Sequence, residues 1–199
     1  MSSSGRIKKE IEDLKRDSSS GIKVEQDPSD PNHLKGTLKG PADTPYARGT
    51  FDVDIIIPSD YPFTPPKMKF ITKLWHPNVS SVTGAICLDI LKDQWSPALT
   101  MKTVMLSLQA LMCTPEPNDP QDAEVANMYL GNQAQFLLTA RFWTESYAMS
   151  KEEVTALPEV HPAVRRLVEM GFAEEACRQA LLETKGNEEA AIETLLVSL

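Results

Sequence analysis

The feature that most constrains the fold is a strict alternation of apolar side chains along residues 51–57. The alternating apolar side chains are those of Phe51, Val53, Ile55 and Ile57. A period of two predicts a β-strand with one buried face. A shorter alternation at Met68 and Phe70 predicts another strand beyond the turn residues 58–60. Because parallel strands need long crossovers, residues 22–72 predict an antiparallel meander.

Helical periodicity precedes and follows this meander. An apolar stripe predicts an N-terminal amphipathic helix through Ile7, Ile11 and Leu14. A buried helix that ends at Thr114-Pro115 is predicted from Leu99, Val104, Leu108, Leu111 and Met112. Two more helices are predicted near 122–131 and 133–147, the latter burying Phe136, Ala140 and Trp143. The expected fold class is α+β, an antiparallel sheet with flanking helices.

Residues 73–99 have neither helical nor strand periodicity and contain Pro77, Gly84 and Pro97. A loop of this length inside a compact domain is uncommon and is usually functional. Just upstream, an aromatic residue precedes a proline after a turn, which predicts a cis peptide bond at Tyr61-Pro62.

A polar connector at 148–160 predicts a domain boundary. The expected organisation is a first domain at 1–149, a linker at 150–159 and a small domain at 160–199. Three short helical patterns fill the small domain, with Pro162 in a first turn and Gly171 and Gly186 at helix ends. About 40 residues is near the lower limit for independent folding.

Composition excludes several classes of protein. The chain has 199 residues with 20 basic and 28 acidic side chains, a net charge of −8, which argues against a nucleic-acid partner. No stretch approaches 18 uninterrupted apolar residues, so no membrane partner is expected. Three cysteines without a CxxC pair predict free thiols, no zinc site and a reducing location, cytoplasmic or also nuclear. Cys113 and Cys177 are expected to be core or half-buried thiols.

Four segments in order, YPFTPPK at 61–67, HPN at 76–78, GAICLDIL at 84–91 and QWSPALT at 94–100, resemble the ubiquitin-conjugating enzymes. The resemblance covers roughly residues 4–148. The tail resembles a ubiquitin-associated (UBA) domain at Met170-Gly171-Phe172 and Leu195-Leu196. The combination resembles the class that builds the ubiquitin chains that target proteins to the proteasome. This resemblance implies a three-helix UBA domain behind a conjugating domain.

Cys87 is the candidate nucleophile, against the alternative that it is a small buried hydrophobe. The resemblance implies a ubiquitin thioester on Cys87, with His76 and Pro77 in a structural loop. A dedicated base is not required, because thiol-to-thiol transfer is nearly balanced and a thiol of pKa about 8.5 is roughly 5–10% ionised near neutral pH. A hydrolytic cysteine enzyme would need such a base.

The second reaction is attack of a lysine amine on the thioester. The resemblance places Asp119 beside the incoming lysine, where its carboxylate would orient the amine or accept its proton. The alternative for Asp119 is an Asx-turn before Pro120. Asn78 would donate a hydrogen bond to the oxyanion or brace the loop, and both alternatives stay open.

The resemblance also implies partner surfaces. The ubiquitin-activating enzyme and RING or HECT ligases would bind the loops at Phe63 and at Ser96, Pro97 and Ala98, together with the first helix at Arg6 and Lys9. The alternative for Phe63 is packing onto the core. No cofactor is expected on this chain, because it has no glycine-rich phosphate loop, so ATP would be used by the activating enzyme.

In the tail, Met170, Gly171, Phe172, Leu195 and Leu196 would offer ubiquitin a small apolar patch, or would simply close a tiny core. One of the two leucines is expected inside and one outside. Three alternatives to a ubiquitin-conjugating enzyme are a non-catalytic ubiquitin-binding adaptor, a conjugating enzyme for another ubiquitin-like modifier, and a thiol hydrolase.

Overall fold

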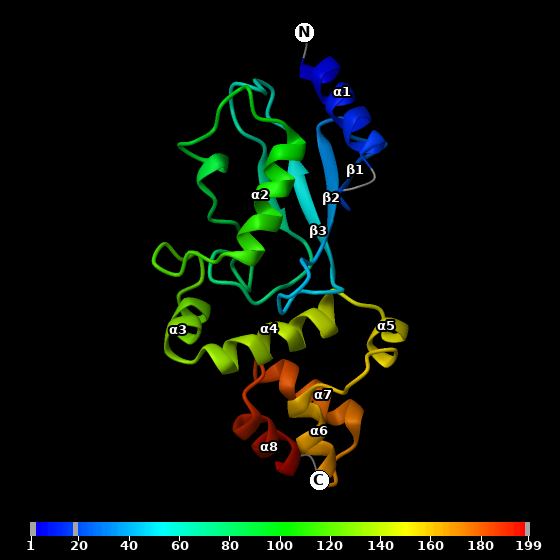
Figure 1. Ribbon diagram of the computed structural model, residues 1–199, viewed down its shortest axis with the longest axis vertical. Helices are drawn as coiled ribbons and strands as arrows, with labels where there is room; N and C mark the ends of the chain where they lie inside the picture. The colour runs from blue at the N-terminus through cyan, green and yellow to red at the C-terminus, as the bar shows by residue number, and fades with distance from the viewer. Residues whose placement is uncertain (1–2, 18–19, 198–199) are drawn as a thin grey trace.

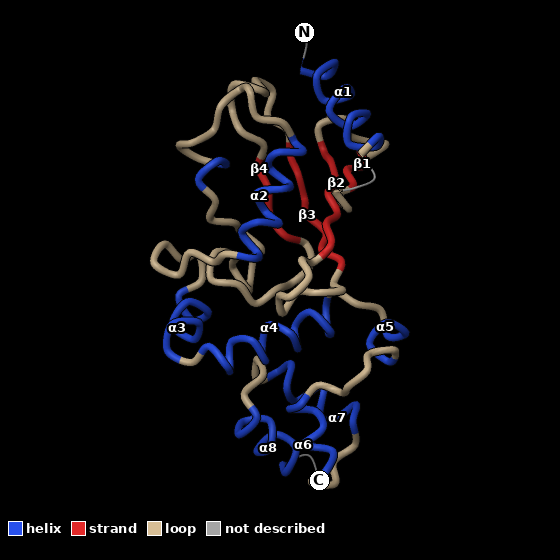
Figure 2. The backbone as a smooth tube through the Cα atoms, in the orientation of Figure 1, coloured by secondary structure: helices blue, strands red, loops and turns tan. Residues whose placement is uncertain are grey.

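The computed structural model describes residues 3–17 and 20–197. Its sheet has four antiparallel strands in chain order (Figure 1 and Figure 2): β1 (Lys23–Gln26), β2 (His33–Lys39), β3 (Thr50–Ile56) and β4 (Lys67–Phe70). The predicted meander is therefore confirmed. The outer ends of the two predicted domains, residues 1–2 and 198–199, lie outside the described residues.

Strand β3 carries the alternation from which the sheet was predicted. Its inward side chains at Phe51, Val53 and Ile55 are fully buried, and Ile57 is buried just beyond the strand. On the outer face, the carboxylate of Asp52 pairs with the ammonium of Lys35 on β2 at 2.8 Å. The pleat thus separates an apolar face from a charged one, as a half-buried strand requires.

Four helices complete the first domain (Figure 1): α1 (Ser3–Arg16), α2 (Met101–Cys113), α3 (Ala123–Gly131) and α4 (Gln133–Tyr147). The predicted stripe of α1, at Ile7, Ile11 and Leu14, is buried. Helix α2 packs on β2, where Gly36 leaves no room for a side chain: an added Cβ would lie 2.8 Å from Cε of Met105.

The prediction that Leu99 lies on the buried face of α2 is wrong. The side-chain hydroxyl of Thr100 accepts a hydrogen bond from the amide of Thr103, so Thr100 is the N-cap and the helix begins at Met101. Leu99 precedes the helix and is half-buried. The other four positions predicted for the buried face, Val104, Leu108, Leu111 and Met112, are all buried.

Between β4 and α2 the chain is irregular, as predicted (Figure 2). The segment contains isolated β-bridges and one short 3₁₀ turn, η1 (Asp89–Leu91). Upstream of it, the Tyr61-Pro62 peptide bond is cis, which confirms the prediction for that bond.

The tail folds into three helices: α6 (Pro162–Glu169), α7 (Glu174–Glu183) and α8 (Glu188–Val197). Gly171 and Gly186 end α6 and α7 with φ angles of 101° and 82°, in the left-handed region that favours glycine. The connector holds a helix that the sequence analysis does not predict, α5 (Lys151–Thr155). A capping box between Ser150 and Glu153 stabilises this single turn.

The tail packs on α4, on the side of that helix that faces away from the sheet (Figure 1). Nε2 of His161 lies 3.0 Å from the carbonyl oxygen of Leu138, and the His161 ring packs at a tilt of 59° against that of Phe142, with the ring centroids 5.3 Å apart. The side-chain amide of Gln135 donates to the carbonyl of Gly186 at 3.2 Å. The tail and the first domain therefore share an interface along α4.

The other two cysteines, Cys113 and Cys177, differ in burial. Cys177 is buried in α7, as expected. Cys113 is exposed, so its prediction as a core or half-buried thiol is wrong. Cys113 is the last residue of α2, where the apolar stripe has already ended at Met112, and its side chain points to solvent.

Candidate active site

The segment that carries Cys87 is folded back on residues 76–80 by backbone hydrogen bonds. The amide of Cys87 donates to the carbonyl of Asn78 at 2.9 Å, and the amide of Ser80 donates to the carbonyl of Ala85 at 2.9 Å. The turn between them needs Gly84, whose φ is 75° and where an added Cβ would lie 2.0 Å from the carbonyl oxygen of Phe70. The thiol is thus held by the main chain rather than by a helix or strand.

His76 is fully buried beneath this segment. Its Nδ1 accepts a hydrogen bond from the amide of Asn78 at 3.0 Å, and its Nε2 lies 3.0 Å from the carbonyl oxygen of Leu111. Burial lowers the pKa of His76 to about 4, so the ring is neutral at physiological pH. With both nitrogens engaged, His76 ties the loop to the end of α2.

The carboxamide of Asn78 is also buried, and it makes three hydrogen bonds to the main chain of residues 116–119. Its Nδ2 donates to the carbonyls of Glu116 and Asp119, both at 2.9 Å. Its Oδ1 accepts from the amide of Glu116 at 2.8 Å. Of the two alternatives, this geometry is that of a loop brace, because both amide hydrogens are already donated to backbone carbonyls.

Further bonds join the same two segments. The amides of Gln121 and Asp122 both donate to the carbonyl of Pro77 at 2.9 Å. The carboxylate of Asp122 accepts from the amide and the hydroxyl of Ser81, at 3.0 and 2.7 Å, and caps α3. Burial alone would raise the pKa of Asp122, but the hydrogen bonds from Ser81 and the α3 amides lower it. No sequence pattern predicts this contact between Asp122 and Ser81.

The thiol of Cys87 lies half-buried between two charged groups. Sγ is 3.5 Å from Oδ2 of Asp119 and 3.4 Å from Nζ of Lys92. The structure therefore brings the predicted pair Cys87 and Asp119 together. Lys92 is missed by the sequence analysis, because a spacing of five residues through an irregular segment does not predict contact.

The proposed partner loops are exposed. Phe63 is 78% exposed, so the alternative that it packs on the core is wrong. Ser96, Pro97 and Ala98 are exposed as well. The indole nitrogen of Trp95 donates to the carbonyl of Pro62 at 2.8 Å, which holds the two loops together.

Lys9 is exposed on α1, but Arg6 is engaged inside the protein. Arg6 pairs with Glu10 at 2.7 Å, donates to the carbonyl of Leu99 at 2.8 Å and lies over the ring of Tyr61. The buried carboxylate of Glu10 also accepts from the hydroxyl of Tyr61 and from the amide of Met101. Glu10 therefore joins α1 to the loop at Tyr61 and to the start of α2, a role that no sequence pattern revealed.

In the tail, the predicted patch is split between surface and core. Met170 and Leu196 are 57% and 58% exposed, whereas Phe172 is half-buried. Leu195 is buried, so the expectation of one leucine inside and one outside is confirmed. Gly171 makes the turn that leaves Met170 outside.

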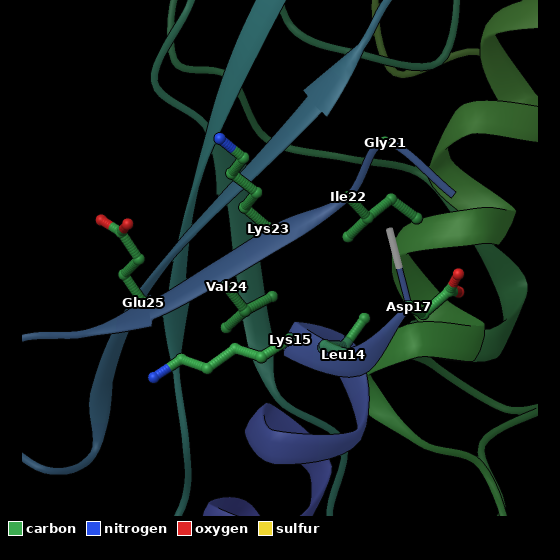
Figure 3. A pocket seen from close by; sticks show the side chains of 8 residues that line it. All are labelled: Leu14, Lys15, Asp17, Gly21, Ile22, Lys23, Val24 and Glu25. Carbon is green, nitrogen blue, oxygen red and sulfur yellow. The ribbon is translucent and has the colours of Figure 1, made fainter. Parts of the chain in front are cut away.

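A separate pocket lies between the end of α1 and β1 (Figure 3). Leu14, Ile22 and Val24 give it apolar walls, and no residue of the thiol segment lines it. Among the described residues, no group of three or more His, Cys, Asp or Glu side chains could hold a metal ion. Within the same residues, no helix is both long and apolar enough to cross a membrane.

Comparison with known proteins agrees with this geometry. Residues 6–144 match the family model described as ubiquitin-conjugating enzyme, and residues 163–195 match the UBA/TS-N domain. Ubiquitin-conjugating enzyme E2 27 of Arabidopsis thaliana is 52% identical over 191 residues, 96% of each chain. Ubiquitin-conjugating enzyme E2 K of Homo sapiens is 49% identical over 194 residues, again 96% of each chain.

Solved structures are similar over the first domain. The E2 domain of a Toxoplasma gondii ubiquitin-conjugating enzyme superposes with a TM-score of 0.70 at 52% identity. The match covers 73% of this chain and 98% of that one. From the matched family model, the near-full-length relatives and this superposition, the chain belongs to the ubiquitin-conjugating enzymes and carries a C-terminal UBA domain.

Proposed function

We propose that this enzyme accepts ubiquitin from the ubiquitin-activating enzyme as a thioester on Cys87 and transfers it to a lysine amine. The observation that carries the proposal is the half-buried thiol of Cys87, 3.5 Å from the Asp119 carboxylate on a loop braced by Asn78. Such a site presents a nucleophile and a proton acceptor to the same reacting carbon.

Charging is an exchange between two thiols. The Cys87 sulfur attacks the thioester carbonyl on the activating enzyme, and the sulfur of that enzyme leaves. ATP is used in the preceding step by the activating enzyme, so this chain needs no cofactor of its own. His76 is neutral and fully hydrogen-bonded, which supports a structural role for it and for Pro77.

Discharge requires a neutral amine, which a free lysine of pKa about 10.4 supplies in only about one molecule per thousand near pH 7.4. The Asp119 carboxylate, beside the thiol, would accept the proton that the amine releases as it attacks. Asn78 would act by holding the carbonyl of Asp119, and so the position of that carboxylate.

The exposed surfaces supply places for partners. Phe63 and the neighbouring loop at Ser96, Pro97 and Ala98 would receive the activating enzyme and RING or HECT ligases, with Lys9 on α1 beside them. An exposed aromatic side chain on a stiffened loop is a typical anchor of such interfaces. Arg6 would contribute by fixing α1 to the loops.

The tail would bind ubiquitin through Met170, Gly171, Phe172 and Leu196, with Leu195 beneath them. A second ubiquitin held there is compatible with the synthesis of polyubiquitin chains. The linkage that targets proteins to the proteasome is proposed from the resemblance of the two-domain combination alone. The test is the linkage type of the chains formed in a reaction with wild-type ubiquitin, read by mass spectrometry.

One charging reaction tests the central step. The protein is mixed with activating enzyme, ATP and ubiquitin, and the products are separated with and without thiol reductant. We expect a reductant-sensitive adduct, replaced in Cys87→Ser by a slower-forming oxygen ester that resists reductant. The matched control is the exposed Cys113, because Cys113→Ser should still charge. Loss of charging in a folded Cys113→Ser protein would contradict the assignment of Cys87.

A further inference from the structure

We propose that Lys92 is a catalytic residue: its ammonium stabilises the negative charge that the Cys87 sulfur carries during transfer. This inference rests on the proposed thioester chemistry of Cys87 and names a group that directly contacts the reacting atom. Nζ of Lys92 lies 3.4 Å from Sγ of Cys87, as close as the carboxylate of Asp119 on the same sulfur.

The main chain holds Lys92 at this distance. The η1 turn brings the amide of Lys92 to the carbonyl of Asp89 at 2.9 Å. The carbonyl of Lys92 in turn accepts from the amide of Trp95 at 3.2 Å. Because both backbone groups are engaged, the Cα of Lys92 is fixed relative to Cys87, although the side chain is exposed.

The ammonium of Lys92 has no competing ion pair in the described part of the chain: no carboxylate lies within 4.0 Å of it. The contrast with Lys102 is clear, since the ammonium of Lys102 is paired with Asp17 at 2.7 Å. A lysine held by its main chain, unpaired and aimed at a sulfur is available to interact with charge on that sulfur.

The chemistry makes use of such a cation in both half-reactions. In charging, the Cys87 sulfur forms a bond to the thioester carbonyl carbon, and the electron pair of the broken bond leaves on the sulfur of the activating enzyme. In discharge, the amine nitrogen bonds to the same carbon, the carbon–sulfur bond breaks, and the electron pair returns to Cys87. The proton of the amine goes to Asp119 or to solvent. The Cys87 sulfur is therefore anionic at the start of one step and at the end of the other.

A positive group beside such a charge lowers the barrier, because it stabilises the negative charge as that charge develops on the sulfur. Asp119 has the opposite sign and would disfavour charge on the sulfur. Lys92 offsets that effect. The two groups therefore have different roles: the carboxylate of Asp119 receives a proton, and the ammonium of Lys92 stabilises charge on the sulfur.

The test compares Lys92→Met, which removes the charge at similar length, with Lys92→Arg, which retains it. Lys151→Met, on the exposed α5, is the control. All are made in a Cys113→Ser background so that Cys87 is the reactive thiol, since Cys177 is buried. The first readout is the rate of alkylation by the neutral reagent iodoacetamide from pH 5 to 10. The second is single-turnover discharge of charged enzyme to free lysine.

For Lys92→Met we expect alkylation near pH 7 to slow by about five- to tenfold, with the pH profile moved toward alkaline pH. Discharge should slow by a similar factor, while Lys92→Arg and Lys151→Met stay within about twofold of the parent. A merely structural role would not move the pH profile of a folded variant. The inference is overturned if Lys92→Met keeps the parent profile, or if Lys92→Arg is as slow as Lys92→Met.

Failure of the proposed function is distinguishable from failure of this inference. A parent protein that alkylates normally but takes no ubiquitin contradicts the thioester proposal, and the role of Lys92 in transfer with it. A parent that charges normally while Lys92→Met reacts at the parent rate contradicts the role of Lys92 alone.

Discussion

The thiol loop and the tail interface both rest on buried polar groups. The two polar side chains that brace the loop, Asn78 and His76, are fully hydrogen-bonded to the main chain, although the buried indole nitrogen of the neighbouring Trp75 has no hydrogen-bond partner among the described residues. At the tail, Glu145 of α4 is buried, and its Oε2 has no hydrogen-bond partner. The nearest cation from the tail, Arg178, is 3.9 Å away.

This difference indicates that the thiol loop is the more rigid region and that the tail is the more easily separated from α4. A buried polar group left unpaired costs roughly 1–3 kcal/mol, whereas a satisfied network stabilises one geometry. The outer contact of the tail, between Lys185 and Glu124, is about half exposed on both sides, and such pairs contribute about 0–1 kcal/mol. We therefore expect the thiol loop to persist under conditions that release the tail from α4.

The largest effect should come from Asp119, which is proposed to accept the proton of the attacking amine. Asp119→Ala should charge normally but discharge to free lysine about 100-fold more slowly, because the proton acceptor beside the sulfur is lost. Single-turnover discharge measures this rate. Discharge at the wild-type rate would contradict this role and would favour the alternative that Asp119 only forms a turn before Pro120.

The carboxamides of Asn78 in the thiol loop and Gln135 at the tail interface test this comparison directly. Asn78→Ala should lower the free energy of unfolding by about 2–3 kcal/mol and slow discharge, since buried groups of residues 116–119 lose their partners. Gln135→Ala removes one half-buried bond to Gly186 and should cost about 1 kcal/mol with unchanged discharge. Urea unfolding measures the loss of stability in each variant, and the discharge assay measures its rate of transfer to free lysine. Equal costs for the two variants would contradict the distinction drawn between the loop and the tail.

Acid should affect both regions, because each contains a buried histidine. Burial lowers the pKa of His76 and of His161 to about 4, from 6.5. The unfolded chain binds more protons, so the stabilisation is complete above about pH 6.5 and is lost as pH falls toward 4. Each histidine accounts for about 3 kcal/mol over that window. Unfolding free energies at pH 7.5 and 4, for wild type, His76→Gln and His161→Gln, measure it.

Two other groups act in the opposite direction. Burial raises the pKa of Glu145, with the Arg141 hydrogen bond opposing, and the hydrogen bond to Asp54 raises the pKa of His33. A group with a raised folded pKa contributes stability at low pH and loses it as pH rises. Each histidine variant should still lose stability at low pH, but less steeply than wild type, because the other buried histidine remains. An unchanged slope in both variants would contradict the assignment.

Periodicity and turn chemistry were enough to predict an antiparallel meander, every described α-helix except α5, and the irregular segment that carries Cys87. Strand β3 was predictable because its alternation reports burial directly, and the glycine helix ends because few other residues adopt positive φ. Leu99 was wrongly placed on the buried face of α2 because the apolar pattern continues back to it across the cap at Thr100. Helix α5 was missed because a single capped turn has no apolar face.

Only those residues of the site that belong to recognisable sequence motifs could be predicted. Cys87, Asn78 and Asp119 come together as expected. Lys92, Glu10 and Asp122 have contacts that depend on how distant loops fold against each other. Glu10, for example, meets Met101 across 91 residues of sequence. No local pattern carries that information.

Substitutions at two glycines, Gly186 and Gly131, distinguish a loss of tail docking on α4 from a change in helix propensity. Gly186 has a φ of 82°, and an added Cβ would lie 3.0 Å from Oγ1 of Thr139 on α4. Gly186→Ala should destabilise by about 1–2 kcal/mol and loosen the tail, with charging unchanged. Gly131, at the end of α3, has open space around it, so Gly131→Ala should change the unfolding free energy by less than about 1 kcal/mol. Thermal unfolding with NMR of α4 resonances checks both, and a neutral Gly186→Ala would contradict the interface.

The smallest effect concerns binding at the tail. Isolated apolar patches of this size bury little area, so we expect ubiquitin to bind the tail with a Kd of about 10–1000 μM. Met170→Ala and Leu196→Ala should each weaken that affinity by about five- to thirtyfold, because both side chains are more than half exposed and add little to the core.

Leu195→Ala is the matched control for Leu196→Ala, since the neighbouring leucine is buried. It should destabilise the tail by about 2–4 kcal/mol rather than weaken binding in the folded state. Titration of labelled enzyme with ubiquitin by NMR, with circular dichroism on each variant, distinguishes the two outcomes. Because Cys87 and its loop lie wholly in the first domain, none of the three changes should alter charging. Unchanged resonances across residues 160–197 of the wild-type protein would mean that the tail is no ubiquitin reader, and that its docking on α4 is its main role.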